Sequence, residues 1–199
     1  MVSKLDFFWD VGSTNSYFAF KFLKPLAAKY GVEISYRPLN LGYVFRHHNY
    51  VLMEEPKTKI DNRKIDLMRW ARKYDLPFKL PTVFPIKTSR ALRGSIAMRD
   101  WELEAEYVEA IFDAYWEDGD NEIGEYASLR AIAARLGVDP DEFEAKAERD
   151  IVRTAIIAET EQALAEGIFG APIIRIEDQM YWGKDRMEFV EAHLAGAPV

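Results

Sequence analysis

Two serine side chains stand at the spacing Ser13-x-x-Ser16, after a run of apolar residues and at the start of a helical pattern. A helix N-terminus presents unpaired backbone N–H groups and the positive end of the helix dipole, so it stabilises an anion. A serine hydroxyl is a poor nucleophile without a base, but as a donor it can hold a bound sulfur as the thiolate. The competing interpretation is that Ser13 or Ser16 only caps the helix.

The elements that position these serines are a strand, a tight turn and a helix. The apolar run Leu5–Trp9 predicts a buried strand, and the amphipathic pattern from Ser13 to Tyr30 predicts a helix that ends at Gly31. The alternating segment Val32–Arg37 predicts a second strand. A β-α-β opening of this kind implies parallel strands joined by a right-handed crossover.

This opening is similar to the place where thioredoxin-like proteins carry their Cys-x-x-Cys motif. The chain contains no cysteine, which excludes disulfides, thiolate-bound zinc and a cysteine nucleophile. The sequence therefore indicates the scaffold of a thiol enzyme that has no thiol of its own. We expect a separate molecule to supply the thiol.

Strand patterns return only at the C-terminal end, at Pro172–Ile176 and Met180–Trp182, before a last helix that ends near Leu194. Helical periodicity dominates the middle of the chain, whereas residues 40–59 and the proline-containing stretch 76–85 are predicted to be loops. The predicted helices cover 61–74, 89–118 in two pieces, 121–136 and 139–165.

The simplest architecture is an α/β, thioredoxin-like domain split by a large all-helical insertion. We assign residues 1–40 and 160–199 to the α/β domain and residues 41–159 to the insertion. A chain of separate domains is disfavoured because neither end alone has enough strands for a stable sheet.

Composition narrows the function classes. The 199 residues carry a net charge of −7, so no basic field favours nucleic acid or an anionic membrane. The first residues lack the apolar run of a signal peptide, and no stretch reaches transmembrane length, so we expect a soluble, cytoplasmic protein. The adjacent His47 and His48 have no third ligand at a useful spacing, so no metal site is predicted.

A proline follows the last long helix, in the segment Ile168–Ile174. Gly170 ends the helix and Pro172 begins a strand, the place where thioredoxin-like folds carry a cis-proline beside the catalytic turn. We therefore predict a cis Ala171–Pro172 bond, with the backbone N–H and C=O near it free to pair with an extended ligand such as glutathione. An ordinary trans proline at a strand start is the alternative.

Two further groups could bind a peptide-like ligand. In Trp182–Arg186, Asp185 could accept from an ammonium while the helix N-terminus binds a carboxylate. Taken alone, the pattern is better explained by a capping aspartate. Lys59 could contact a ligand carboxylate, and Trp70 could pack on an aromatic substrate. A solvated lysine and a core tryptophan are the alternative.

Taken together, these segments resemble the 2-hydroxychromene-2-carboxylate isomerase family, whose members are DsbA-type thioredoxin-like proteins close to the kappa class of glutathione transferases. The resemblance runs over nearly the whole chain and in the order of the family. The segments that carry it are Phe8–Tyr17, Lys64–Tyr74, Phe169–Pro172 and Tyr181–Arg186.

The resemblance implies that Ser13 is the catalytic serine that holds the sulfur of glutathione, the expected cofactor. It implies a homodimer, and an isomerase acting on an aromatic substrate of the chromene carboxylate or benzylidenepyruvate type by reversible thiolate addition. The alternatives are a kappa-like transferase that conjugates electrophiles and a non-catalytic peptide-binding module. The remaining glutathione contacts that it implies are Asn49, Lys59, Ala171, Pro172, Lys184 and Asp185.

The chain departs from the family pattern at Thr14-Asn15, where many members carry a proline and then an aromatic residue. This change alters a wall of the expected substrate pocket. Lys184 also stands where related proteins have Ser or Asn. The candidates for an aromatic wall are Trp9, Tyr17, Trp70 and Trp182, some of which must belong to the core.

Overall fold

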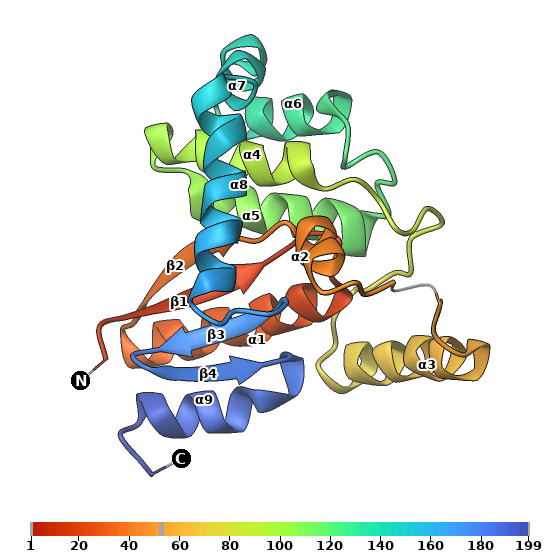
Figure 1. The fold of residues 1–199 in the computed structure, drawn as a ribbon, viewed down its shortest axis with the longest axis vertical. Helices are drawn as coiled ribbons and strands as arrows, with labels where there is room; N and C mark the ends of the chain where they lie inside the picture. The colour runs from red at the N-terminus through yellow and green to blue at the C-terminus, as the bar shows by residue number, and fades with distance from the viewer. Residues whose placement is uncertain (1, 52–53, 199) are drawn as a thin grey trace.

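The N-terminal β-α-β unit forms as predicted in a computed structural model that describes residues 2–51 and 54–198 (Figure 1). Its elements are β1 (Lys4–Trp9), α1 (Thr14–Tyr30) and β2 (Glu33–Pro38). Gly31 ends α1 in the left-handed conformation, with φ 67°, which glycine adopts without steric cost. The two strands run parallel, as the crossover requires.

The sheet has four strands in the order β2-β1-β3-β4. Strands β3 (Ile173–Ile176) and β4 (Gln179–Trp182) form the terminal hairpin, and β3 lies antiparallel to β1. The two C-terminal strand predictions are therefore confirmed. A last helix, α9 (Met187–Leu194), follows the short 3-10 turn η4 (Lys184–Arg186).

Helices cover both faces of the sheet because the side chains of β1 alternate between two apolar clusters. Phe7 belongs to the larger cluster, which includes α1 and Val190 of α9. Phe8 points to the opposite face, where the smaller cluster includes Val44 of α2 (Leu41–His47) and Ala163 of α8 (Asp150–Ala165). In Figure 1, α8 crosses in front of the sheet while α1 lies behind it.

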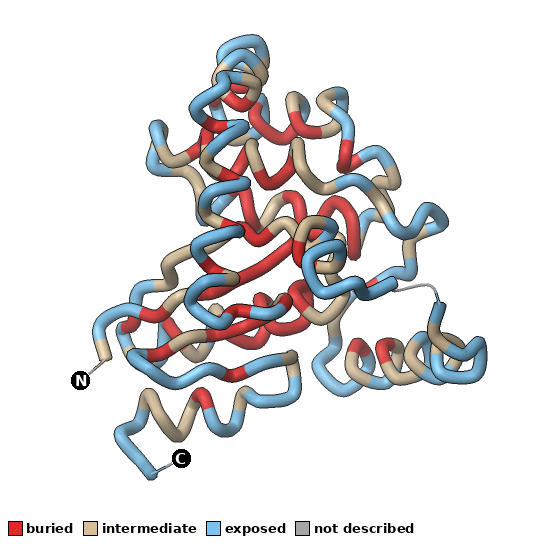
Figure 2. Tube along the Cα trace, in the orientation of Figure 1, coloured by how far each residue is buried: buried red, intermediate tan, exposed pale blue. Residues whose placement is uncertain are grey.

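The helical insertion between β2 and β3 gathers mostly above the sheet, whereas α3 lies to one side (Figure 1). The larger apolar cluster runs from the sheet into these helices, as the buried segments of Figure 2 show. The division at residues 41 and 159 stays a prediction. Besides α2 and α8, the insertion contains α3 (Lys57–Lys73), α4 (Ser89–Met98), α5 (Glu104–Asp113), α6 (Tyr126–Arg135) and α7 (Pro140–Ala147), with a 3-10 turn η2 (Arg99–Trp101) and a π-helical turn η3 (Ala114–Asp118).

The predicted loop over 40–59 is wrong in part, because α2 occupies residues 41–47 and α3 already begins at Lys57. Helix α2 has seven residues and buries only Val44, so it shows no periodicity that a sequence pattern could reveal. Its start is fixed by Asn40, whose side chain accepts from the backbone N–H of Tyr43 at 3.0 Å.

The single helix predicted over 139–165 is also wrong, because the chain breaks between α7 and α8. Arg149 is extended there, with ψ 140°, although neither glycine nor proline marks the break. The preceding Glu148 contacts Arg93, Tyr126 and Arg153, so tertiary contacts end the helix. The predicted helix over 121–136 forms only from Tyr126 onward.

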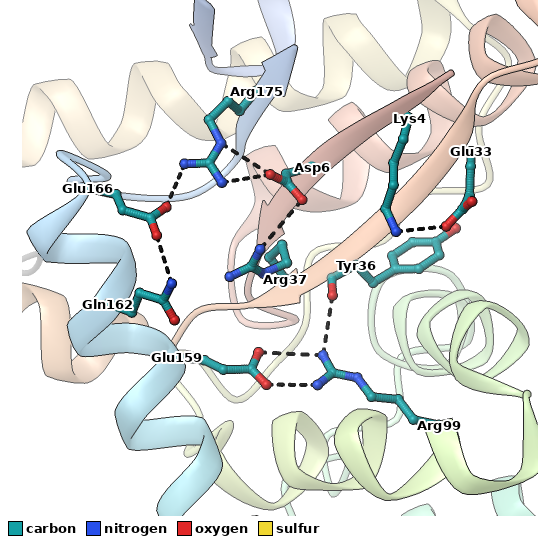
Figure 3. Close-up of polar contacts among 10 residues, drawn as sticks. All are labelled: Lys4, Asp6, Glu33, Tyr36, Arg37, Arg99, Glu159, Gln162, Glu166 and Arg175. Carbon is teal, nitrogen blue, oxygen red and sulfur yellow. Dashed lines mark hydrogen bonds and ion pairs between the residues drawn. The ribbon is translucent and has the colours of Figure 1, made fainter. Parts of the chain in front are cut away.

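Two arginines connect the insertion to the sheet (Figure 3). Arg175 of β3 binds Asp6 of β1 at 2.7 Å and Glu166, just after α8, at 2.5 Å. Arg99 of η2 binds Glu159 of α8 at 2.7 Å and donates to the carbonyl oxygen of Tyr36 in β2 at 3.3 Å. These contacts hold α8 across the sheet and set the C-terminal end of α8 next to β3.

At Gly94, α4 lies very close to α5 and α7. A Cβ atom placed on Gly94 of α4 would lie 2.1 Å from the Tyr107 hydroxyl oxygen of α5 and 2.9 Å from Cζ of Phe143 in α7. Both aromatic rings are fully buried. Only glycine fits this crossing.

We predict that Gly94→Ala destabilises the protein by about 2 kcal/mol in urea unfolding. The gain in helix propensity, about 1 kcal/mol, is smaller than the cost of overpacking a buried contact. Gly42→Ala is the matched control, since the added Cβ would meet only side-chain atoms of Asn40 and Arg46 at 3.3 and 3.6 Å. Equal stability of the two variants would contradict the packing argument.

Candidate active site

Ser13 is the N-cap of α1, and its hydroxyl does two things at once. Its Oγ accepts from the backbone N–H of Ser16 at 3.1 Å and donates to the carbonyl oxygen of Ala171 at 3.3 Å. Capping uses a lone pair and leaves the hydroxyl hydrogen free to turn. Ser16 is fully buried, so Ser13 alone of the two serines reaches the surface.

The Ala171–Pro172 peptide bond is cis, as predicted, and lies beside the Ser13 turn. The backbone N–H of Gly183 donates to the carbonyl oxygen of Pro172 at 3.1 Å. Through these two hydrogen bonds, the Ala171–Pro172 segment connects the N-terminus of α1 with the Gly183 turn that leads into η4.

Lys184 projects between α1 and α3. Its Nζ donates to Oδ1 of Asn15 at 3.0 Å and lies 5.1 Å from the ring centroid of Trp70. Burial lowers the pKa of Lys184, while the charges of Asp66 and Asp185 oppose that shift. No carboxylate in the described part of the chain lies within 4.0 Å of this ammonium, so it keeps N–H donors for a ligand.

The side chain of Asp185 lies against Gly183, which adopts φ 102°. A Cβ on Gly183 would lie 2.7 Å from Oδ1 of Asp185, so the carboxyl group packs directly on the glycine. The other oxygen accepts from Arg186 at 2.6 Å. The carboxylate is half exposed and can exchange this partner for a ligand ammonium.

Asn49 and Lys59 lie further from this centre. Asn49 is exposed just after α2, with φ 53°, and Lys59 binds Glu55 at 2.9 Å. Across residues 2–51 and 54–198, no hydrogen bond or ion pair connects either side chain to Ser13. Lys59 and Trp70 share a face of α3, because eleven residues make about three turns.

The four aromatic wall candidates separate by burial. Trp9 and Tyr17 are fully buried and belong to the core, so their assignment to a substrate wall is wrong. Trp70 is half-buried beside Lys184, and Trp182 is 57% exposed, which leaves these two rings available to a ligand.

Asp10 is the residue of this site to which sequence reasoning gave no role. It is 2% exposed, and its carboxylate accepts from Gly12 N–H at 2.8 Å, Leu41 N–H at 3.0 Å and the Thr88 hydroxyl at 3.0 Å. The Asp-x-Gly spacing is typical of a turn in which the aspartate side chain accepts from the backbone two residues on. The hydrogen bond from Gly12 could therefore have been predicted from the sequence. The hydrogen bonds from Leu41 and Thr88, which are 31 and 78 residues away, leave no such pattern in the sequence.

Burial raises the pKa of Asp10 to about 6, although the hydrogen bonds from Leu41, Gly12 and Thr88 lower it in part. The carboxyl group therefore changes its charge close to neutral pH.

Comparison with known proteins identifies the family. The model of the DSBA-like thioredoxin domain matches residues 4–195. A 2-hydroxychromene-2-carboxylate isomerase from Pseudomonas sp. (strain C18) is 31% identical over 98% of this chain and 92% of its own length. This chain belongs to the 2-hydroxychromene-2-carboxylate isomerase family of DSBA-like thioredoxin proteins.

The fold agrees with that assignment. A solved structure of 2-hydroxychromene-2-carboxylate isomerase superposes with a TM-score of 0.87 at 30% identity, covering 97% of this chain and 95% of that one. Glutathione S-transferase kappa 1 of Caenorhabditis elegans is a more distant relative, 24% identical over 94% of this chain and 88% of its own length.

Among the described residues, neither a membrane-spanning helix nor a metal-binding cluster is present. No helix there combines the length and the apolarity that crossing a bilayer requires. No group of three or more His, Asp or Glu side chains there could hold a metal ion.

We predict that Asp10→Asn removes a pH-dependent part of the stability. A carboxyl group with a folded pKa raised from 3.8 to about 6 binds its proton more tightly in the folded state. The stability that this tighter proton binding gives to the folded state is present in full below about pH 4 and is lost as the pH rises through about 6. The unfolding free energy of the wild type should therefore fall by about 2 kcal/mol relative to Asp10→Asn between about pH 4 and 7.

Urea unfolding of both proteins at several pH values measures this difference. Parallel stability curves across the whole range would contradict an Asp10 that titrates in the folded protein.

Proposed function

We propose that this protein is a glutathione-dependent isomerase that acts on an aromatic substrate of the chromene carboxylate or benzylidenepyruvate type. The observation that carries the proposal is the Ser13 hydroxyl at the N-terminus of α1, which caps the helix and still has a hydrogen to give. The family to which the chain belongs supports the same activity. We expect the enzyme to act as a homodimer in the cytoplasm.

The role of Ser13 is to stabilise an anionic sulfur. Its hydrogen turns from the carbonyl of Ala171, a contact of 3.3 Å, toward a sulfur at the helix N-terminus while the capping bond stays in place. Bringing a thiol pKa from about 8.5 to 7 requires about 2 kcal/mol. A hydrogen bond to a charged group contributes about 1.5–3 kcal/mol and a helix terminus about 0.3–1 kcal/mol, so these two groups suffice.

The other candidate residues fit the ends of a tripeptide. The backbone of Ala171 and Pro172 would pair with the cysteinyl residue, and Lys184 and Asp185 would receive the γ-glutamyl carboxylate and ammonium. An ammonium without a carboxylate partner and a half-exposed carboxylate on adjacent residues match a zwitterion. Asn49, just after α2, and Lys59 of α3 would make the remaining contacts with the ligand.

Bound glutathione supplies a thiolate that adds reversibly to a conjugated carbonyl compound, so that a double bond becomes a single bond that can rotate before the thiolate leaves. The protein holds the aromatic ring of the substrate. Trp70 of α3 lies 5.1 Å from Nζ of Lys184, and Trp182 ends β4 two residues before Lys184. Both rings keep exposed surface for an aromatic substrate.

We predict that Ser13→Ala lowers kcat/KM for 2-hydroxychromene-2-carboxylate by about 100-fold, the typical cost of losing one donor to a reacting anion. The same variant should raise the pKa of the bound thiol, measured by thiolate absorbance. Ser13→Gly is the control for capping, because glycine at an N-cap costs only a few tenths of a kcal/mol while it also lacks the hydroxyl.

Ser13→Thr keeps the hydroxyl and should keep most of the activity. If Ser13→Ala and Ser13→Gly bind glutathione with an unchanged thiol pKa, Ser13 is a structural cap and the proposed mechanism is wrong.

A kappa-like transferase is the second candidate, and the kappa relative favours it. The two activities differ in the fate of glutathione, which an isomerase returns and a transferase consumes. We predict that the glutathione concentration stays constant over many turnovers of the aromatic substrate. A fall equal to the product formed would identify a transferase, and an absence of any glutathione binding would favour a peptide-binding module.

A further inference from the structure

Three segments that surround the Ser13 turn meet at the buried carboxylate of Asp10. One oxygen accepts from Gly12 in the turn itself, at 2.8 Å. The other accepts from Leu41 at the start of α2 and from Thr88 just before α4, both at 3.0 Å. Leu41 and Thr88 come from the insertion, so one side chain connects the turn to two of its supports.

The turn packs tightly against this carboxylate. A Cβ on Gly12 would lie 2.9 Å from Cγ2 of Thr88 and 3.4 Å from Oδ1 of Asp10. The carbonyl oxygen of Asp10 also accepts from the backbone N–H of Ser13 at 3.0 Å. A change at this carboxylate is therefore transmitted to Ser13 through backbone, without a flexible link between them.

We propose that Asp10 is a positioning residue for the ligand site at Ser13, and that only its ionised carboxylate holds the turn and the starts of α2 and α4 in the binding arrangement. The proposal rests on the glutathione site proposed above, because it concerns how that site is kept in shape. Asp10 itself is buried beneath the turn and does not touch the ligand.

Protonation matters because the three groups on Asp10 all donate to it. An ionised carboxylate accepts from all of them, whereas a protonated one carries a donor on one oxygen. The hydroxyl of Thr88 can reverse its hydrogen bond, but the backbone N–H of Leu41, which shares that oxygen, cannot. Uptake of a proton therefore weakens the connection between the turn and α2.

Among the described residues, no charged side chain makes a hydrogen bond or an ion pair with the Asp10 carboxylate. The turn and α2 present backbone N–H groups, and Thr88 presents a hydroxyl. From η3, Tyr115 faces the site, and its hydroxyl donates to the carbonyl of Val83 at 2.9 Å. Burial and, to a lesser degree, the charge of Asp10 raise the pKa of Tyr115, so it stays neutral at physiological pH.

The test is the affinity for S-methylglutathione between about pH 5 and 8, measured by calorimetry. This analogue has no ionisable thiol, so a change of affinity in that window belongs to the protein. We expect the wild-type affinity to fall below about pH 6. Thr88→Val removes a donor to the carboxylate without changing its charge, and should move the midpoint upward by about half to one pH unit.

Thr88→Ser restores the hydroxyl and should restore the wild-type midpoint. Asp10→Asn should show no midpoint in this range. If Thr88→Val keeps the wild-type midpoint, a group other than Asp10 sets the pH dependence, and the role of Asp10 is overturned. A wild-type affinity that is constant across the range overturns it as well.

A ligand-free measurement separates this inference from the proposed function. In nuclear magnetic resonance, the amide signals of Gly12 and Leu41 should follow the Asp10 carboxyl carbon through one common midpoint that Thr88→Val displaces. If the wild type binds no glutathione or S-methylglutathione at any pH, the proposed function fails whatever these signals do. If the two amides do not follow Asp10, the positioning role fails even when glutathione binds.

Discussion

The turn between β1 and α1 is the constraint on which the rest of this structure depends. The Ser13 hydroxyl closes the first turn of α1 through Ser16 and reaches Ala171 across 158 positions of sequence. A helix N-terminus is useful chemically only if its N–H groups and a donor face the same point, and a single serine satisfies both conditions here. The chain has no cysteine, so the isomerase that we propose needs an external thiol at this point.

The helical insertion supports that turn. Its helices share one apolar cluster with α1 and β1. Arg175 of β3 binds Glu166 just after α8, and Arg99 of η2 donates to the backbone carbonyl of Tyr36 in β2. Leu41 and Thr88 carry this support to the turn itself through Asp10. Membership of the 2-hydroxychromene-2-carboxylate isomerase family accounts for the scaffold, whereas the choice of substrate depends on the side chains at its surface.

Lys184 illustrates how two local substitutions come to act together. The sequence shows Asn15 and Lys184 as separate departures from a family pattern, with no sign that they touch. In the folded chain the ammonium bonds to Asn15 and lies over Trp70 of α3, so a cation stands at the first turn of α1. A half-buried charge of this kind favours an anionic ligand group, since no carboxylate of the described residues neutralises it within 4.0 Å.

Features that depend on neighbouring residues could be predicted from the sequence. These are the strand-turn-helix around Ser13 and the terminal hairpin, because periodicity, caps and turn chemistry act locally. The cis Ala171–Pro172 bond follows from the resemblance to thioredoxin-like folds, since the local pattern also fits a trans proline. Packing between distant segments decided the break after Ala147, which no glycine or proline marks, and the burial of Trp9. It also decided the three-way contact of Asp10, since hydrogen bonds between distant segments leave no spacing in the sequence from which they could be read.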